Sequence, residues 1–426
     1  MKVTLLTLGC RVNQSESAII EATLRKKGVS VVGLEENPDY CLVNTCTVTS
    51  KSDYNSRQLI RRAARAGAKV IVTGCYSQLR PEEIKKIRGV HGICDNNNKY
   101  DVIDIFTTAE NANDKSSSQT ELTENPEELF FGSYSQSRPY LKVQDGCNFR
   151  CSYCSVPLAR GRSRSIPLKE VIRRAQEIEL YGYKEIVLTG IHLGAYGHDL
   201  SEKTDINSLI KKLLENTKKC RIRLSSLEIS EINEELVELF QDKRLCNHLH
   251  IPLQSGNEKI LRLMRRNYTP EKFTGMIKRI SERVDNVSIG SDIIVGFPEE
   301  GEKEFNDTLS MINDLPFTYL HIFPFSARPG TEAYNMKNLP LQSEVKNRLK
   351  SIREIAVQKK RNYLNRQLNK SLETVIEDRT PDGFTTGTSS NYLKIRIRSD
   401  VHEKGSIVNV RSVRLANDMV EGIVIL

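Results

Sequence analysis

The sequence contains no uninterrupted apolar run of the length that spans a membrane. Its first ten residues are apolar, but they are too few for a signal peptide and lack a small-residue cleavage site, so we expect them to form a first strand. Both absences favour a cytoplasmic location. With 426 residues, of which 38% are hydrophobic and 27% charged, the chain is long enough for two or three domains with ample cores.

The ten cysteines also lack the spacing of a disulfide scaffold, and in a reducing compartment this favours metal binding. Three of them form a short loop, in which three residues separate Cys147 from Cys151 and two separate Cys151 from Cys154. No fourth Cys or His follows at zinc-finger spacing. A 4Fe-4S cluster held by three cysteines leaves one iron without a protein ligand, and a chelating substrate can bind there. A zinc loop or an unrelated metal clip is the alternative.

Three strand-like segments near the N-terminus, residues 3–8, 40–43 and 70–72, are each followed by a cysteine. Helical patterns between them predict a parallel α/β sheet. The strand ends that carry the onward turn lie on one edge of such a sheet, which is where open α/β sheets bind ligands. We therefore expect Cys10, Cys46 and Cys75 to form a second three-thiolate site. Three unrelated buried cysteines are the alternative.

Strand and helix patterns alternate again from residue 138. The candidate strands are residues 140–144, 184–189, 221–225, 248–253, 287–295 and 319–323. Six such units are too few for a closed eight-unit barrel. The pattern divides the chain into an N-terminal domain at 1–110, a polar linker at 111–137, a central domain at 138–366 and a small β module at 367–426.

Two basic patterns are candidate RNA contacts. Arg160, Arg162 and Arg164 occupy every second position, so an extended segment would place their guanidinium groups on one side. Lys394, Arg396 and Arg398 alternate with apolar residues and would form a basic row on a strand. For the three arginines, the alternative is ion pairing with local acids. For the strand, the alternative is an ordinary solvated face. The net charge of +9 permits binding to a polyanion without requiring it.

The loop from Cys147 to Cys154, with Tyr153 before its last cysteine, resembles the signature of radical S-adenosylmethionine (SAM) enzymes. The resemblance implies a 4Fe-4S cluster whose open iron binds SAM, and cleavage of SAM to a 5′-deoxyadenosyl radical. It also implies that the six central strands form a partial (β/α)6 barrel, with the cysteine loop on its catalytic rim.

SAM contacts are expected along the same rim. The resemblance places residues 290–298, including Ile294 and Gly296, along the adenine, and glycines in a strand often mark a close ligand approach. It places Thr189 and Gly190 near the methionine end of SAM. Further candidates at strand ends or in the cysteine loop are Tyr153, Ser225, Glu228 and Gln254. A satisfied loop or cap hydrogen bond is the alternative for each polar residue. Structural roles are expected for most histidines near strand ends, because radical hydrogen abstraction needs no general base.

The combination of two cysteine trios resembles the methylthiotransferases, in which an N-terminal domain holds an auxiliary 4Fe-4S cluster associated with sulfur. The similarity extends over residues 7–14, 44–49 and 73–76. The C-terminal module resembles the TRAM domain, an RNA-binding appendage. The implied fold class is α/β: an N-terminal parallel-sheet α/β domain, a partial (β/α)6 radical SAM barrel and a small antiparallel β-barrel of TRAM type.

Members of this family modify different substrates. The segments 9–13, 188–197 and 321–331 are most similar to the type that acts on N6-threonylcarbamoyladenosine next to the tRNA anticodon. The implied reaction inserts sulfur at C2 of the adenine and takes the methyl group from a second SAM. The implied partners are tRNA and a one-electron reductant such as flavodoxin or ferredoxin, with the sulfur donor unknown. Alternatives are action on isopentenyladenosine in tRNA or on an aspartate of a ribosomal protein, and a non-catalytic RNA-binding protein with structural zinc.

Overall fold

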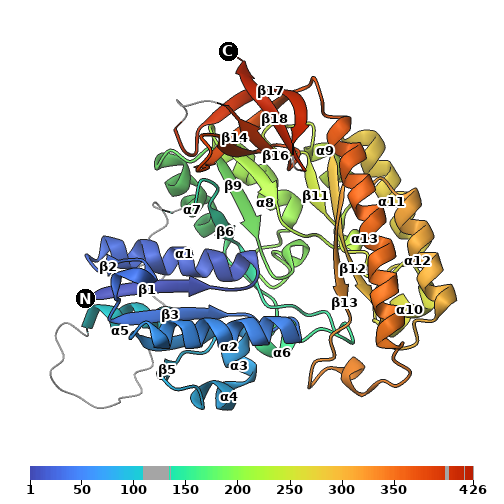
Figure 1. The fold of residues 1–426 in the computed structure, drawn as a ribbon. Helices are drawn as coiled ribbons and strands as arrows, with labels where there is room; N and C mark the ends of the chain where they lie inside the picture. Colours follow the sequence, from blue (N-terminus) through green and yellow to red (C-terminus); the bar gives the residue numbers. More distant parts are fainter. Residues whose placement is uncertain (109–133, 135, 399–402, 417, 426) are drawn as a thin grey trace.

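The structure is a computed structural model that describes residues 1–108, 134, 136–398, 403–416 and 418–425. Most of the predicted linker at 111–137 therefore lies outside the described residues. Three units are visible, the first at the left of Figure 1, the second at its centre and right, and the third at its top.

The first unit is a five-stranded parallel sheet in the order β2-β1-β3-β4-β5. Its strands are β1 (Lys2–Thr7), β2 (Ser30–Val31), β3 (Tyr40–Thr45), β4 (Lys69–Gly74) and β5 (Val90–Ile93). Its helices are α1 (Arg11–Lys26), α2 (Ser50–Arg65), α3 (Cys75–Leu79), α4 (Pro81–Lys85) and α5 (Val102–Thr108). The predicted strand–helix alternation is confirmed.

Alternating side chains along the central strands bury both faces of this sheet. Leu42 and Ile71 pack with residues of α1 and α5, whereas Cys41 and Val43 pack with residues of α2 and α4. Helix α2 begins at Ser50, where the side chain of its N-cap residue Thr49 accepts a hydrogen bond from the backbone of Ser52.

The second unit contains the six predicted strands as a partial barrel. They are β6 (Tyr140–Lys142), β9 (Glu185–Thr189), β10 (Arg221–Leu224), β11 (His248–His250), β12 (Ser288–Val295) and β13 (Tyr319–Pro324). They form two three-stranded parallel sheets, β10-β9-β6 and β11-β12-β13. Isolated parallel bridges between these sheets pair Ile222 with Leu245 and Ser226 with His250. The short β7 (Gln144–Asp145) and β8 (Arg164–Ser165) pair separately near the cysteine loop.

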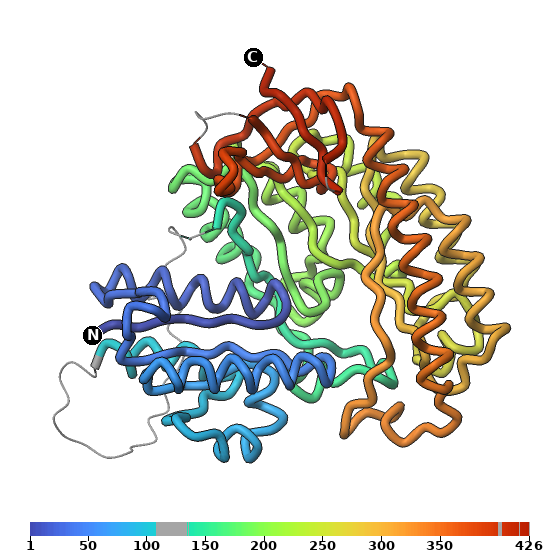
Figure 2. Tube along the Cα trace, in the orientation of Figure 1, coloured from blue at the N-terminus to red at the C-terminus, as the bar shows by residue number. Residues whose placement is uncertain are grey.

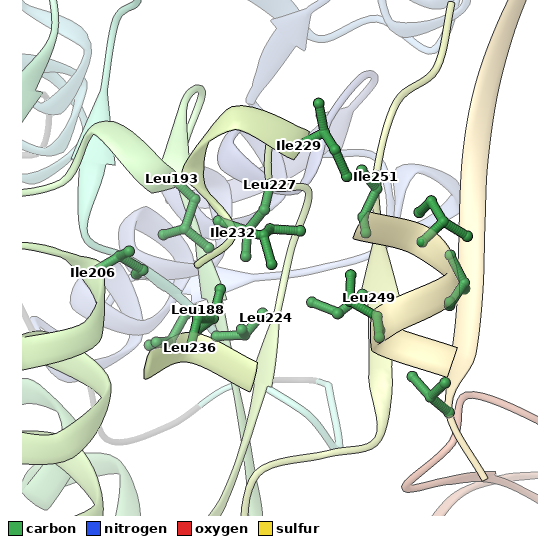
Figure 3. Close-up of a cluster of buried hydrophobic side chains, with 14 of the residues drawn as sticks. Leu188, Leu193, Ile206, Leu224, Leu227, Ile229, Ile232, Leu236, Leu249 and Ile251 are labelled. Atoms are coloured by element: carbon green, nitrogen blue, oxygen red, sulfur yellow. The ribbon is translucent and has the colours of Figure 1, made fainter. Parts of the chain in front are cut away.

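Helices cover the outside of this barrel: α7 (Leu168–Leu180), α8 (Ile206–Asn216), α9 (Glu234–Leu239), α10 (Glu258–Leu263), α11 (Pro270–Arg283), α12 (Glu302–Asp314) and the long α13 (Gln342–Asn365). The helix α6 (Val156–Arg160) follows the cysteine loop. Apolar side chains between strands and helices form one continuous core. Figure 3 shows part of it, with Leu188, Leu224 and Leu249 contributed by three neighbouring strands.

The third unit is a closed barrel, β14-β15-β16-β18-β17. Its strands are β14 (Ser371–Arg379), β15 (Thr385–Ser389), β16 (Lys394–Ile397), β17 (Ile407–Ala416) and β18 (Met419–Ile425). The pairs are antiparallel, as expected, apart from β16 and β18, which run parallel. The trace in Figure 2 shows this barrel, in red, over one end of the central unit.

Buried arginines on β10 hold the third unit in place. Arg221 donates to the carboxylate of Glu373 at 2.9 Å, and Arg223 donates to the backbone oxygen of Ser389 at 2.8 Å. Both guanidinium groups also pair with the buried Glu185, at 2.7 and 2.6 Å. The C-terminal module is thus joined to the barrel by hydrogen bonds and ion pairs. None of the described helices is both long enough and apolar enough to cross a bilayer.

Candidate functional site

One cavity of about 620 Å³ lies between the first and second units, and all six predicted cluster cysteines line it: Cys10, Cys46, Cys75, Cys147, Cys151 and Cys154. Strands β1 and β3 point their carboxyl ends toward the central unit in Figure 1. The two trios therefore face a common space. The other four cysteines do not line this cavity, and Cys41, Cys220 and Cys246 are buried.

Two glycines shape the N-terminal trio. Gly9, at φ +108°, precedes Cys10, and a Cβ atom there would lie 2.8 Å from the Cβ atom of Cys46. Gly74, at φ +100°, precedes Cys75, and a Cβ atom there would lie 2.4 Å from the backbone oxygen of Thr45. Because L side chains rarely adopt this φ and no space is available, the chain turns tightly at both strand ends. These turns bring the three thiols together.

Backbone hydrogen bonds fix the second cysteine loop. The amide of Cys147 donates to the carbonyl of Gly161 at 3.1 Å, and the amide of Ser152 donates to the carbonyl of Met264 at 3.1 Å. The carbonyl of Ser152 accepts from the amide of Ala333 at 2.7 Å. The loop is thus tied to segments that lie far from it in the sequence.

Arg160 lies beside the N-terminal trio, in a buried network of charges. Its Nε donates to the Cys75 sulfur at 3.3 Å, and its Nη1 pairs with Glu16 at 2.9 Å and Asp145 at 3.0 Å. Lys99 adds a fully buried pair with Glu16 at 2.6 Å. The network joins the first unit to the second, because Glu16 and Lys99 belong to one, and Arg160 and Asp145 to the other.

A second arginine lies beside the trio of Cys147, Cys151 and Cys154. Arg266 Nη1 is 3.5 Å from the Cys151 sulfur, and its guanidinium pairs with Glu228. His192 Nδ1 is 3.7 Å from the Cys147 sulfur, and its Nε2 pairs with Glu231. Burial opposes protonation of His192, but Cys147 and Glu231 raise its pKa to about 10. Each trio thus has a cationic donor beside it, which suits a cluster with thiolate ligands.

The donor set fits iron–sulfur clusters. Burial raises the pKa of Cys46 to about 11 and that of Cys154 to about 12, so these thiols resist ionisation unless a metal compensates the charge. Three cysteines per trio leave one position of a 4Fe-4S cluster for another ligand. The Ser225 hydroxyl on the cavity wall is buried and has no hydrogen-bond partner among the described residues, as expected of a group that awaits a ligand.

Six of the eight predicted SAM contacts line the cavity: Tyr153, Thr189, Gly190, Ser225, Glu228 and Gln254. Ile294 and Gly296 are not among the described residues that line it. The space beside Gly296 is occupied by Val345 of α13, 2.6 Å from an added Cβ atom, and the ring of Tyr319 occupies the space beside Gly290. The glycines in this strand therefore accommodate side chains of the chain itself.

The basic patterns differ from the expected geometry. Arg160 ends α6 and is buried, so it has no side-chain surface for RNA and does not share a face with Arg162 and Arg164, which are exposed. Arg160 forms ion pairs, as the alternative predicted, but one of its two partners, Glu16, belongs to the first unit and is not a local acid. In the third unit, Lys394 pairs with Glu377 at 2.5 Å.

Arg396 is likewise paired, with Glu421 at 2.9 Å, and its guanidinium lies 3.6 Å above the ring of Phe384. Arg398 is exposed near the same ring, at 5.9 Å. The strand carries less unpaired charge than its sequence indicates.

The cavity also has a wall that sequence reasoning did not assign. Asp292 accepts hydrogen bonds from His250 Nε2 at 3.0 Å and His321 Nδ1 at 3.1 Å, and Tyr319 lies beside His250. Arg11 lines the same cavity. The signal in the sequence was weak, because histidines near strand ends are common and nothing local marks their partners.

The comparisons with known proteins agree with this geometry. Residues 141–312 match the model of the Radical SAM superfamily, and residues 2–94 match that of the uncharacterized protein family UPF0004. The chain is similar to the solved structure of the radical S-adenosylmethionine methyltransferase TsrM from Kitasatospora setae, with a TM-score of 0.55 and 15% identity over 78% of this chain and 76% of that one. This likeness concerns the fold.

Curated relatives match over nearly the whole length. The chain is 35% identical to the threonylcarbamoyladenosine tRNA methylthiotransferase MtaB of Aquifex aeolicus, over 96% of this chain and 100% of that protein. It is 30% identical to the tRNA-2-methylthio-N(6)-dimethylallyladenosine synthase of Thermodesulfovibrio yellowstonii, over 99% and 98%. With two cysteine trios in one cavity and relatives of this identity and coverage, the chain belongs to the methylthiotransferase family of radical SAM enzymes.

Proposed function

We propose that this enzyme adds a methylthio group to C2 of N6-threonylcarbamoyladenosine next to the tRNA anticodon. The observation that carries the proposal is the single cavity lined by both cysteine trios, because sulfur associated with one trio and the carbon activated at the other must come together. A protein with two structural zinc loops has no need of such a shared, open space.

We assign Cys147, Cys151 and Cys154 to the radical SAM 4Fe-4S cluster, and Cys10, Cys46 and Cys75 to the auxiliary 4Fe-4S cluster. When bound, the clusters and SAM supply the radical and sulfur chemistry. The chain contributes the cavity, the cationic donors Arg160 and Arg266, and polar groups on the SAM side. The unpartnered hydroxyl of Ser225 is the clearest candidate for a hydrogen bond to SAM.

Support for the threonylcarbamoyl substrate comes from the position in the structure of the segments that resemble the threonylcarbamoyladenosine type. The segments 9–13, 188–197 and 321–331 are those most similar to the threonylcarbamoyladenosine type, and each contributes residues to the cavity wall. The relative from Aquifex aeolicus is named after that substrate. Segments that differ with substrate are expected at the substrate pocket, so their joint placement favours this assignment.

The other partners follow from the same proposal. The exposed Arg162, Arg164, Lys394 and Arg398 are candidates for contacts with the tRNA backbone. A cytoplasmic one-electron reductant such as flavodoxin or ferredoxin would supply electrons to the radical SAM trio. We propose that residues 1–110, 138–366 and 367–426 are the methylthiotransferase, radical SAM and TRAM-like domains.

Two variants test the reaction on the intact, reconstituted protein. Full-length enzyme should contain about eight irons, and Cys147→Ala and Cys75→Ala should each contain about four. Both variants should fail to convert N6-threonylcarbamoyladenosine in tRNA, as measured by nucleoside mass spectrometry, but Cys75→Ala should still cleave SAM. Conversion of isopentenyladenosine in place of the threonylcarbamoyl nucleoside would assign the enzyme to the type that acts on isopentenyladenosine. Purification of a colourless protein that contains zinc would refute the proposal that the protein is an enzyme.

A further inference from the structure

Three arginines line the cavity, and they differ in their partners. Arg160 is paired with two carboxylates, and Arg266 is paired with Glu228. Arg11 has no carboxylate within ion-pair distance among the residues that the structure describes. Its Nη2 donates to the hydroxyl of Tyr392 at 3.2 Å, and its guanidinium lies 5.9 Å from the centre of that ring. Arg11 therefore brings an uncompensated positive charge to the wall of the substrate cavity.

The position of Arg11 is set from both sides. It is the first residue of α1 and follows Cys10, so its backbone is fixed by the turn that places the N-terminal trio. Tyr392 stacks on His248 with 4.1 Å between ring centres and lies 5.4 Å below the guanidinium of Arg223. A guanidinium has five N–H donors, and the hydrogen bond from Arg11 to Tyr392 uses only one of them.

Among the described residues, the neighbours of Arg11 on the cavity wall offer it no carboxylate of their own. The nearby Tyr319 is half-buried, and desolvation raises its pKa, so it stays neutral. Asp292, on the same wall, already accepts hydrogen bonds from His250 and His321. The first turn of α1 contains no acidic residue, and its N-cap side chain accepts no hydrogen bond from the helix backbone, so the helix N-terminus adds partial positive charge. This corner of the cavity suits a bound anion.

We propose that Arg11 recognises the carboxylate of the threonylcarbamoyl group and so selects the acidic nucleoside over an apolar one. This inference rests on the proposed function and deepens it. The threonylcarbamoyl group ends in a carboxylate, for which a guanidinium is the matching donor. An isopentenyl group in the same place would leave the charge of Arg11 desolvated without an anionic partner, which disfavours that substrate. Arg11 is thus a specificity-determining residue, and the chemistry at C2 does not involve it.

The test combines a change in the substrate with a change in the enzyme. Anticodon stem-loop RNAs carry threonylcarbamoyladenosine, its methyl ester or isopentenyladenosine, and kcat/KM is measured with reconstituted wild-type protein, Arg11→Met and Arg11→Lys. For the wild type, we expect the free acid to exceed the ester by about tenfold to a hundredfold, as for a lost charge-assisted hydrogen bond. Arg11→Met should lower kcat/KM for the acid to that for the ester, and Arg11→Lys should keep part of the difference.

Controls separate specificity from damage to the neighbouring Cys10. Each variant is assayed for iron content and for SAM cleavage without RNA. Both should be unchanged if Arg11 only binds the nucleoside. Arg61→Met removes an exposed charge from α2 and should preserve the ratio of acid to ester. The comparison of the free acid with its methyl ester uses only the wild-type enzyme, so it remains decisive if Arg11→Met fails to assemble its cluster.

The outcomes distinguish this inference from the proposed function. Equal kcat/KM of the wild type for acid and ester, or an undiminished preference for the acid in Arg11→Met, would overturn the role of Arg11 while the methylthiotransferase reaction stands. No methylthio product from the threonylcarbamoyl RNA with iron-loaded wild type would instead overturn the proposed function.

Discussion

Replacing Arg160 with methionine tests whether buried charges hold the N-terminal and central units together. The guanidinium is fully buried and lies 2.9 Å from Glu16 and 3.0 Å from Asp145. Removing one partner of a buried pair costs about 3–5 kcal/mol, because the remaining charge is left desolvated. Lys99 and Lys142 stay 2.6 and 3.2 Å from Glu16 and compensate part of this loss, so we expect about 3 kcal/mol, at the lower end of that range.

Calorimetry of the full-length, iron-loaded protein measures this change. For a cooperative unit of roughly 150–250 residues, about 3 kcal/mol lowers the transition by roughly 6–12 °C. Arg162→Met is the matched control, because it removes an exposed arginine two residues away and should change stability by less than about 0.5 kcal/mol. A loss below about 1 kcal/mol in Arg160→Met would refute the reasoning from burial.

The pH dependence gives an independent check. Burial would raise the pKa of Glu16, but Arg160, Lys99 and Lys142 lower it well below its ordinary value of 4.5. A carboxyl whose pKa is lowered by folding contributes stability above its unfolded pKa, and this contribution is lost as the pH falls through the folded value. Wild-type stability should therefore fall on acidification below about pH 4.5, and Arg160→Met should show a shallower fall.

The reduction potential of the auxiliary cluster reports on the hydrogen bond from Arg160 to the Cys75 sulfur separately from the ion pairs of Arg160. Arg160 Nε donates to the Cys75 sulfur at 3.3 Å, and a hydrogen bond from a cation favours the more negative, reduced cluster. The reduction potential of the auxiliary cluster should fall in Arg160→Met, as measured by titration monitored with electron paramagnetic resonance. An unchanged potential would show that this hydrogen bond does not act on the cluster.

Further predictions concern the trios and the docking of the C-terminal barrel. Gly74→Ala should contain about four irons in place of eight, because the added Cβ atom would lie 2.4 Å from the backbone oxygen of Thr45 at a positive φ; a full iron content would contradict this. Cys41→Ala should keep its iron, unlike Cys75→Ala, because Cys41 packs in the core away from the cavity; lost iron would make it a ligand. Glu185→Gln leaves buried arginines without their carboxylate and should destabilise the protein by about 3–5 kcal/mol, with faster proteolysis between α13 and β14; unchanged proteolysis would show that this ion pair does not secure the barrel.

Several features of the site were predictable from the sequence because they depend on local pattern. Strand–helix alternation predicts a parallel sheet, and in such a sheet the residues after each strand meet at one edge. This is why Cys10, Cys46 and Cys75 were expected together and why they line one cavity. The spacing from Cys147 to Cys154 is equally local, because three thiols on one short loop must converge.

The contacts of charged and small residues were not predictable in the same way. Arg160 is part of an alternating basic pattern in the sequence, yet it is buried and paired with Glu16. The local pattern does not show this pairing, because Glu16 lies 144 positions away in the chain. Gly296 leaves space for Val345 of a distant helix, a contact that its local sequence does not indicate. In each case the partner comes from another unit or helix, and no periodicity records it.

By itself, the sequence determined the two thiolate trios and the strand–helix alternation of the first two units, since these follow from residue spacing and hydrophobic periodicity. Only the tertiary structure decided that both trios open into one cavity, that Arg160 is buried and that Arg11 faces the same cavity without an acid beside it. The physical reason is that burial and charge compensation depend on which distant segments pack together, and that packing is a property of the whole fold.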